Sequence, residues 1–277
     1  MPRDIAVVMD VAGTILKMYR VAKDIGRDII LKKIVTWELI MEKRGRALVV
    51  PQIDPKLIIF CRPDDPLCTL IEGREDGVEI SCSSSPISKD EAVSILRRSQ
   101  AKVRELQEVH QLVLARCPER YQTVGMIVDE DLQEITHSLS TGGVPFPGLQ
   151  EVLSRLESLG ADVYLASGDS MRSLVRLKDY GINPKRVYAV ASPRRKQEIV
   201  AGLKKDYRRV VMVGDGLNDL YALKAADLSV LTVQQDTRPA LELCQVADEI
   251  IRDIQELPEI VRAYPRNLLF PPGREKK

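Results

Sequence analysis

The sequence lacks any long apolar run, and no stretch approaches the roughly 18 residues that a membrane-spanning helix requires. Its first residues, Met-Pro-Arg-Asp, lead directly into a short apolar segment and do not have the pattern of a secretory signal peptide. These two absences predict a cytoplasmic protein that has no membrane partner.

Neither sign of charge is in excess, because Lys and Arg together number 41 while Asp and Glu together number 40. Proteins that bind nucleic acid or acidic membrane surfaces typically carry a basic surplus. The composition therefore gives no reason to expect nucleic acid as a partner, and it leaves the oligomeric state open.

Cysteine is scarce, and no two cysteines form a Cys-x-x-Cys pair. Neither His110 nor His137 stands within a few residues of a cysteine. Zinc sites are usually built from closely spaced ligand pairs, so we do not expect zinc. We expect reduced thiols that serve as small apolar side chains at Cys61, Cys68, Cys82, Cys117 and Cys244.

What the sequence does have is a regular alternation of short apolar runs and amphipathic helical patterns between about residues 145 and 255. This rhythm is typical of an α/β fold, a doubly wound parallel sheet with helices on both faces. Residues 4–10 supply one more strand of the same apolar kind. The other expected strands are 163–166, 187–190, 210–213, 228–231 and 249–251, and the expected helices are 149–159, 171–177, 199–203 and 219–226.

The region from 20 to 125 does not keep this alternation. A capping box at Ser88-Lys-Asp-Glu91 predicts the start of a long helix. We therefore expect a core formed by 1–19 and 126–264, with a smaller α+β cap inserted at 20–125. Short strands are expected within the cap at 47–50, 57–61 and 78–82, and a flexible tail at 265–277.

Two acidic segments each follow an apolar run, Asp10-Val-Ala-Gly-Thr14 and Gly214-Asp-Gly-Leu-Asn-Asp219. The carboxyl ends of parallel strands lie together and form the ligand crevice of such a sheet. Asp10, Asp215 and Asp219 would then meet in one acidic pocket. Three converging carboxylates are unstable without a cation, which suggests magnesium and a phosphate group.

Two further segments offer groups for a phosphate. Ser167 and Gly168 follow the expected strand 163–166, where a hydroxyl and a backbone amide could hold a phosphoryl oxygen. Lys196 stands at the start of an expected helix, and a lysine there could neutralise charge on a transferring phosphoryl group. Taken singly, the Ser-Gly segment is weak evidence because it also suits a helix N-cap, and a solvated lysine is the better interpretation of Lys196.

Taken together and in this order, the four segments resemble the haloacid dehalogenase superfamily, whose members are mostly magnesium-dependent phosphotransferases. The resemblance covers residues 4–18 and about 145–255, and it is closest to the phosphorylation domain of P-type ATPases. The segments Leu165–Asp169 and Val213–Asp227 carry that closer likeness. It implies a magnesium-dependent phosphohydrolase or phosphotransferase that forms an aspartyl-phosphate with a small phosphorylated substrate.

The resemblance also implies a role for each matching residue. These roles are Asp10 as nucleophile; Asp10, the Ala12 carbonyl, Asp215 and Asp219 as magnesium ligands; Thr14, Ser167 and Gly168 as ligands of the phosphoryl oxygens; Lys196 as the neutralising cation; and Asn218 as the residue that orients the site.

Residue 12 departs from the pattern of the family's phosphatases, which carry an aspartate there as general acid and base. Here the position is Ala12. A group of this kind is typically worth about 10²–10⁴-fold in rate, so hydrolysis is expected to be slow. A carboxylate or imidazole from elsewhere would restore it, and Glu134 and His137 are candidates.

The alanine also leaves two alternative functions open. Phosphonoacetaldehyde hydrolase shares the Asp-x-Ala-Gly-Thr motif, which implies carbon–phosphorus bond cleavage through a Schiff-base lysine. Lys17, Lys23, Lys32 and Lys33 would be the candidates for that lysine. The second alternative is a non-catalytic protein that binds phosphate and magnesium in a regulatory or scaffold role.

Overall fold

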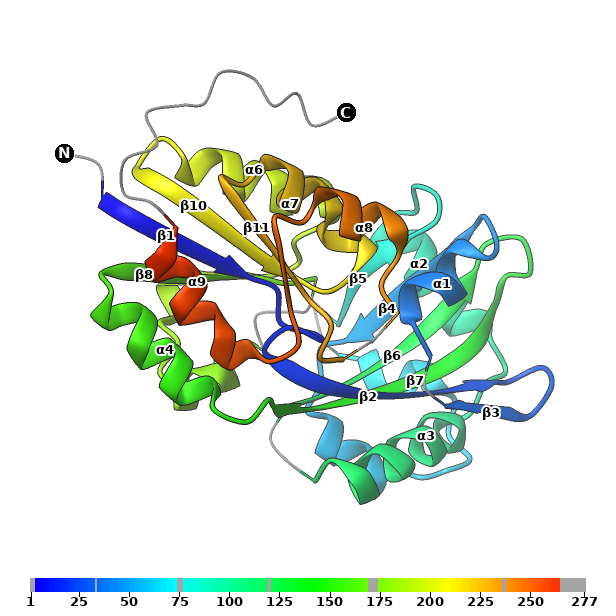
Figure 1. Ribbon diagram of the computed structural model, residues 1–277. Coiled ribbons are helices and arrows are strands. Elements are labelled where there is room, and N and C mark those ends of the chain that lie inside the picture. Colours follow the sequence, from blue (N-terminus) through cyan, green and yellow to red (C-terminus); the bar gives the residue numbers. More distant parts are fainter. Residues whose placement is uncertain are drawn as a thin grey trace. The chain divides into compact units, whose positions relative to one another are not determined.

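The computed structural model describes residues 3–32, 34–73, 77–118, 121–168, 174–235 and 238–264. The chain divides into a core unit, residues 1–17 and 145–277, and an insert unit, residues 18–144 (Figure 1). The expected cap boundary at 125 was wrong, because the segment up to 144 belongs to the insert. The expected tail at 265–277 lies outside the described residues.

The core unit contains a six-stranded sheet in the order β12-β11-β10-β1-β8-β9, and its strands pair in parallel. This confirms the α/β fold class. Val, Ile and Leu dominate the central strands, as suits strands that are covered on both faces. The strands are β1 (Arg3–Met9), β8 (Ala161–Ala166), β9 (Val187–Tyr188), β10 (Tyr207–Gly214), β11 (Leu228–Thr232) and β12 (Glu249–Ile251).

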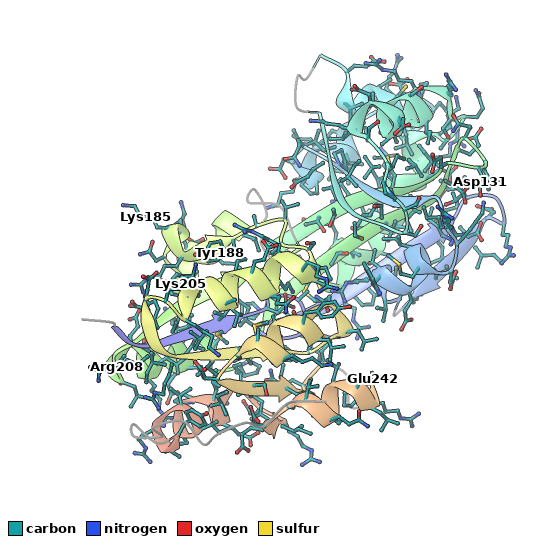
Figure 2. The ribbon with its side chains drawn as sticks, turned by 90° about the horizontal axis from the view of Figure 1, so that it is seen from above. Asp131, Lys185, Tyr188, Lys205, Arg208 and Glu242 are labelled. Atoms are coloured by element: carbon teal, nitrogen blue, oxygen red, sulfur yellow. The ribbon has the colours of Figure 1, made fainter. Side chains whose placement is uncertain are left out.

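Helices cover both faces of this sheet (Figure 1). On one face, Ala6 and Val8 of β1 belong to an apolar cluster with Ile199, Leu223 and Leu243 from three helices. Charged side chains such as Lys205, Arg208 and Glu242 are exposed on the outside (Figure 2). The helices on that face are α6 (Pro193–Leu203), α7 (Leu220–Ala225) and α8 (Leu241–Val246), and those on the other face are α4 (Leu149–Ser158) and α9 (Leu257–Ala263).

The helix expected at 171–177 falls partly outside the described residues. Its described continuation is a 3₁₀ helix, η3 (Val175–Tyr180), which ends at Gly181 with φ of 90°. Among the described residues, no helix combines the length and the apolar character needed to cross a membrane.

The insert unit is built on a six-stranded antiparallel sheet in the order β3-β2-β7-β6-β4-β5. An apolar cluster joins this sheet to α2 and α3, with Ile95, Leu96 and Leu106 among its buried members. The strands are β2 (Leu16–Asp24), β3 (Ile29–Lys32), β4 (Arg46–Pro51), β5 (Val78–Ser83), β6 (Tyr121–Asp129) and β7 (Glu134–Pro145); the helices are α1 (Thr36–Met41), α2 (Lys89–Arg98) and α3 (Val103–Arg116).

Two expectations for the insert were wrong. The apolar run at 57–61 is not a strand, because Pro55–Phe60 forms a 3₁₀ helix that Asp54 caps at its start. The single long helix is two helices, since α2 begins at the capping box as expected but ends at Arg98. The Ser99 hydroxyl donates a hydrogen bond to Glu134 Oε2 at 2.6 Å and so draws the chain away from the helical path.

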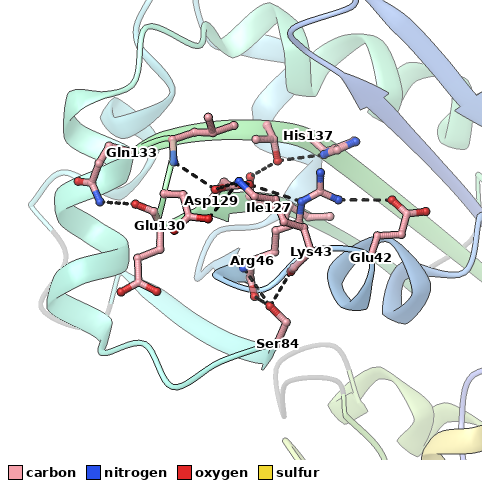
Figure 3. Close-up of polar contacts among 12 residues, drawn as sticks. Glu42, Lys43, Arg46, Ser84, Ile127, Asp129, Glu130, Gln133 and His137 are labelled. Carbon is pink, nitrogen blue, oxygen red and sulfur yellow. Dashed lines mark hydrogen bonds and ion pairs between the residues drawn. The ribbon is translucent and has the colours of Figure 1, made fainter.

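A buried carboxylate lies at the end of β6 in the insert (Figure 3). Asp129 is fully buried, and its Oδ1 lies 2.8 Å from Lys43 Nζ. Its Oδ2 lies 3.6 Å from Arg46 Nε, and the Leu132 amide donates to Oδ1 at 3.2 Å. Burial alone would raise the pKa of Asp129, but the hydrogen bond from Lys43 and the neighbouring charges lower it below its ordinary value.

Asp129→Asn is expected to lower the free energy of unfolding by about 2 kcal/mol at neutral pH, because a buried charge-assisted pair is lost. A depressed carboxyl pKa gives stability that is present above the unfolded pKa and is lost as the pH falls through the folded one. The gap between wild type and variant should therefore close on acidification in urea titrations. Asp131→Asn is the control: Asp131 is exposed and 3.4 Å from the same lysine (Figure 2). An equal loss in both variants would contradict this account.

Candidate active site

The site is formed where β1 and β10 end side by side. The two strands pair in parallel with Met9 opposite Val213, and the Asp10 amide donates to the Val213 carbonyl at 2.9 Å. Asp10, Asp215 and Asp219 each offer a carboxylate oxygen, and these oxygens lie within 4.8 Å of one another. The convergence expected from the two strand ends is therefore present in the structure.

Gly13 makes this convergence possible. It has φ of +86°, and a Cβ at this position would lie 1.8 Å from Asp215 Oδ2. The loop after β1 therefore approaches the Asp215 carboxylate more closely than any side chain permits. Glycine at residue 13 is required by both its backbone conformation and its neighbour.

Gly13→Ala is expected to destabilise the protein more than Gly160→Ala. Gly160 has nearly the same φ, +76°, but no atom lies within 4 Å of its added Cβ. Gly160→Ala carries only the backbone cost of about 1–2 kcal/mol, whereas Gly13→Ala must also displace Asp215, which should cost at least about 1 kcal/mol more. Urea unfolding of the two metal-free variants measures the difference, and equal losses would show that the contact is not tight.

Lys196 lies in the first turn of α6. The helix begins at Pro193, because the Ser192 side chain accepts a hydrogen bond from the Arg195 amide and proline favours the first turn of a helix. The Lys196 side chain is 1% exposed, and its Nζ donates to Asp10 Oδ1 at 2.6 Å and to Asp219 Oδ1 at 2.7 Å. Burial alone would lower the pKa of Lys196, but the two carboxylates raise it, so the ammonium stays protonated.

Asp219 is the fully buried member of the three carboxylates. Besides Lys196, the amides of Asp215 and Gly216 donate to its Oδ2 at 3.2 and 3.3 Å. Burial and the nearby charge of Asp10 raise the pKa of Asp219 to about 6, although Lys196 opposes the shift. Asp219 therefore anchors Lys196 and the loop that carries Asp215.

The charges of this cluster fit a divalent cation. Three carboxylates and one ammonium leave two negative charges in a largely buried space. The donors are all oxygen atoms, which magnesium prefers, and an uncompensated buried charge is strongly unfavourable. The donor set and its charge therefore suit Mg²⁺ better than a softer metal.

Thr14 adds a buried hydroxyl without a partner. The residue is fully buried, and within the described part of the chain its Oγ1 makes no hydrogen bond. Leaving such a group unsatisfied costs about 1–3 kcal/mol, so the hydroxyl points to a ligand that would accept or donate there. A phosphoryl oxygen is such a partner.

Gln234 holds the Thr14 loop in place, and the sequence analysis missed it. Its Nε2 donates to the Thr14 carbonyl at 3.3 Å, and its Oε1 accepts from the Ile254 amide at 2.8 Å. Gln234 follows the carboxyl end of β11, so the rule that located Asp10 and Asp215 could have found it.

The remaining candidates also lie at this edge of the core sheet. Leu165 of β8 pairs with Met9, so the buried Ser167 and its neighbour Gly168 follow the strand next to Asp10. Asn218 folds back over Gly216, with its Oδ1 2.5 Å from the position that a Cβ would take. The part-exposed Ala12 lies in the loop after β1.

The two candidate replacements for the missing acid and base belong to the insert. Glu134 accepts from the Ser99 hydroxyl at 2.6 Å, and His137 Nδ1 lies 3.0 Å from Thr136 Oγ1. Burial lowers the pKa of His137. The contacts of both residues are therefore explained by the packing of the insert itself.

Lys23 is unsuited to a Schiff base. It is buried, and its Nζ lies within 2.7 Å of carboxylates from Asp28, Glu105 and Glu108. Burial alone would lower the pKa of Lys23, but these carboxylates raise it, whereas a Schiff base requires a neutral amine. Lys33, another candidate, lies outside the described residues.

A family model and several known proteins match this chain. A family model described as haloacid dehalogenase-like hydrolase matches residues 6–227. A soluble P-type ATPase-like phosphatase of Methanocaldococcus jannaschii is 32% identical over 262 residues, which are 93% of each chain. A probable copper-importing P-type ATPase of Enterococcus hirae is 34% identical over 29% of this chain and 11% of its own length. A structure of a phospho-aspartyl intermediate analogue of phosphoserine phosphatase covers 94% of this chain and 99% of that one, at 15% identity and a TM-score of 0.44.

Proposed function

The chain belongs to the haloacid dehalogenase-like hydrolases, and from this we propose that it is a magnesium-dependent phosphatase that forms an aspartyl-phosphate on Asp10. The substrate would be a small phosphorylated molecule. The observation that carries the proposal is the buried Lys196, which joins Asp10 to Asp219 while Asp215 faces the same space.

Asp10 would act as the nucleophile. Lys196 donates a hydrogen bond to its Oδ1, which orients the second oxygen for attack on phosphorus. A bond forms between this oxygen and phosphorus while the bond from phosphorus to the leaving oxygen breaks. Water then attacks the same phosphorus, and the bonding electron pair returns to Asp10 as phosphate is released.

The phosphoryl oxygens would be bound by groups around Asp10. The Thr14 hydroxyl would gain the partner that it lacks, and Ser167 with the Gly168 amide would hold further oxygens. Lys196 would balance the negative charge that the phosphoryl group brings. Asn218 would orient the loop through its position over Gly216.

The magnesium ligands would be Asp10, Asp215, the Ala12 carbonyl, and Asp219 directly or through water. When bound, the ion would neutralise charge on the phosphoryl oxygens. The net charge of the cluster and its oxygen-only donors support this assignment.

Turnover of 4-nitrophenyl phosphate against magnesium concentration tests the proposal. A chelator should stop turnover, and added magnesium should restore it. Asp215→Asn should raise the magnesium concentration needed for half-maximal rate by at least about tenfold, since it removes a ligand charge. The exposed Asp206→Asn is the control and should leave the magnesium requirement unchanged. Turnover that persists in chelator, or an unchanged requirement in Asp215→Asn, would refute the proposal.

A further inference from the structure

Val190 has a backbone conformation that valine rarely adopts. Its φ is +51°, in the left-handed region, where the Cβ crowds the following carbonyl and a branched side chain makes the crowding worse. Among the described residues, the other non-glycine residues with positive φ are Asp28 and Gln133, which are polar and lie in hairpin turns. Val190 is therefore a point of backbone strain, and such points tend to lie at functional sites.

The side chain of Val190 does not account for this conformation. It is 38% exposed, whereas its neighbours Tyr188 and Ala191 belong to the apolar cluster that includes Ile199. Burial of the Val190 side chain therefore gives little to offset the cost of a left-handed backbone. The conformation must be imposed by the contacts of the residues on either side.

Two backbone hydrogen bonds hold the chain on both sides of Val190 against Ser167. The Ser167 amide donates to the Tyr188 carbonyl at 3.0 Å, and the Ala191 amide donates to the Ser167 carbonyl at 2.8 Å. Both backbone groups of Ser167, which is 1% exposed, are thus bound to the turn that contains Val190. The position of Ser167, a proposed ligand of the phosphoryl oxygens, therefore depends on the shape of this turn.

The same turn leads directly into the helix that carries Lys196. Ser192 caps α6, because its hydroxyl accepts from the Arg195 amide at 3.2 Å. The Lys196 amide donates to the Ser192 carbonyl at 2.9 Å, and Lys196 Nζ reaches Asp10 at 2.6 Å. The turn is therefore a short link between two groups that are proposed to bind the phosphoryl group.

We propose that the left-handed turn at Val190 is a positioning element of the active site, which fixes the spacing between Ser167 and Lys196. This inference rests on the proposed function and adds a positioning residue to the same site. A left-handed valine has a narrow range of allowed backbone angles, so the turn is stiff once its neighbours impose it. Strain and stiffness therefore have one origin, and substitutions at residue 190 can separate them.

Val190→Gly should remove both the strain and the stiffness. The melting temperature of the full chain without metal should not fall below the wild-type value, because the relieved crowding offsets the greater freedom of glycine in the unfolded chain. Glycine also visits other backbone regions, which lets Ser167 and Lys196 drift apart. We expect kcat/KM for 4-nitrophenyl phosphate, measured with magnesium, to fall by at least about tenfold. The magnesium requirement should change by less than the roughly tenfold that loss of a ligand causes, since the proposed ligands follow β1 and β10.

Val190→Asn is the rescue variant, because asparagine adopts the left-handed region more readily than valine and keeps a Cβ that restricts the turn. It should raise the melting temperature by about 2–4 °C and keep kcat/KM close to the wild-type value. Gln133→Gly is the control, since it places glycine at a left-handed position in a hairpin of the insert. It should leave kcat/KM unchanged.

An unchanged kcat/KM in Val190→Gly, with turnover that is lost in Asp10→Asn, would overturn the inference and leave the proposed function intact. A lower melting temperature in Val190→Gly would also overturn it, because the wild-type turn would then not be strained. The same holds for an equal fall of kcat/KM in Val190→Asn or in Gln133→Gly. Absence of any Asp10-dependent turnover would instead overturn the proposed function, and the inference with it.

Discussion

Asp10→Asn will reduce phosphatase turnover by on the order of 10³-fold or more, because asparagine has the shape of aspartate but cannot form the acyl phosphate. The variant should stay folded. Lys196 keeps Asp219 as a partner at 2.7 Å, so no buried charge is left without compensation. The loss of activity will then reflect chemistry and not unfolding.

The covalent intermediate gives this variant a second readout. Acid quenching of the wild-type enzyme during turnover should trap protein that is heavier by one phosphoryl group, and hydroxylamine should release it, as it does other acyl phosphates. Asp10→Asn should show no such species, while the exposed Asp206→Asn should show it at the wild-type level. A phosphorylated Asp10→Asn protein would place the nucleophile elsewhere.

The core and its acidic site could be predicted from the sequence because they follow from simple rules. Buried parallel strands appear as continuous apolar runs, and their carboxyl ends must meet at one edge. Those rules predict that Asp10, Asp215 and Asp219 converge, and in the structure their oxygens lie within 4.8 Å of one another. They also placed Lys196 at a helix start, but its complete burial between two carboxylates was not visible in the sequence.

The insert was harder to predict because its elements depend on tertiary contacts. The break between α2 and α3 comes from the hydrogen bond between Ser99 and Glu134, which are far apart in the sequence. Strands β6 and β7 extend the insert to residue 144, and β4, which pairs with β6, lies some eighty residues earlier in the chain. Local patterns at 20–125 do not contain this information.

Burial is also what separates Lys196 from an ordinary lysine of the same helix, such as Lys204 at its carboxyl end. Lys204 offers the comparison, since its Nζ lies 2.6 Å from Asp227 but its side chain is 39% exposed. The ion pairs have nearly the same length, but Lys196 is buried between two carboxylates, whereas Lys204 is exposed and is paired with one. Exposed pairs typically contribute about 0–1 kcal/mol, whereas removal of one partner from a buried pair costs about 3–5 kcal/mol.

Lys196→Met will therefore lower the free energy of unfolding of the metal-free protein by about 3–5 kcal/mol, because it leaves Asp10 and Asp219 buried without a counter-ion. It should also reduce turnover by about 10²–10³-fold, as expected when a group that stabilises transferring charge is removed. Lys204→Met should change stability by less than about 1 kcal/mol and leave turnover unchanged.

The pH dependence distinguishes this cause from a simple loss of packing. The pKa of Asp219 is already raised by burial and Asp10, and removal of Lys196 takes away the charge that opposes the shift. A carboxyl group with a raised folded pKa gives stability that is present below its unfolded pKa and is lost as the pH rises through the folded value. The deficit of Lys196→Met, measured by urea unfolding in chelator, should therefore shrink on acidification from pH 8 toward about pH 5. A deficit that does not change with pH would mean that methionine simply packs poorly in the space that lysine fills.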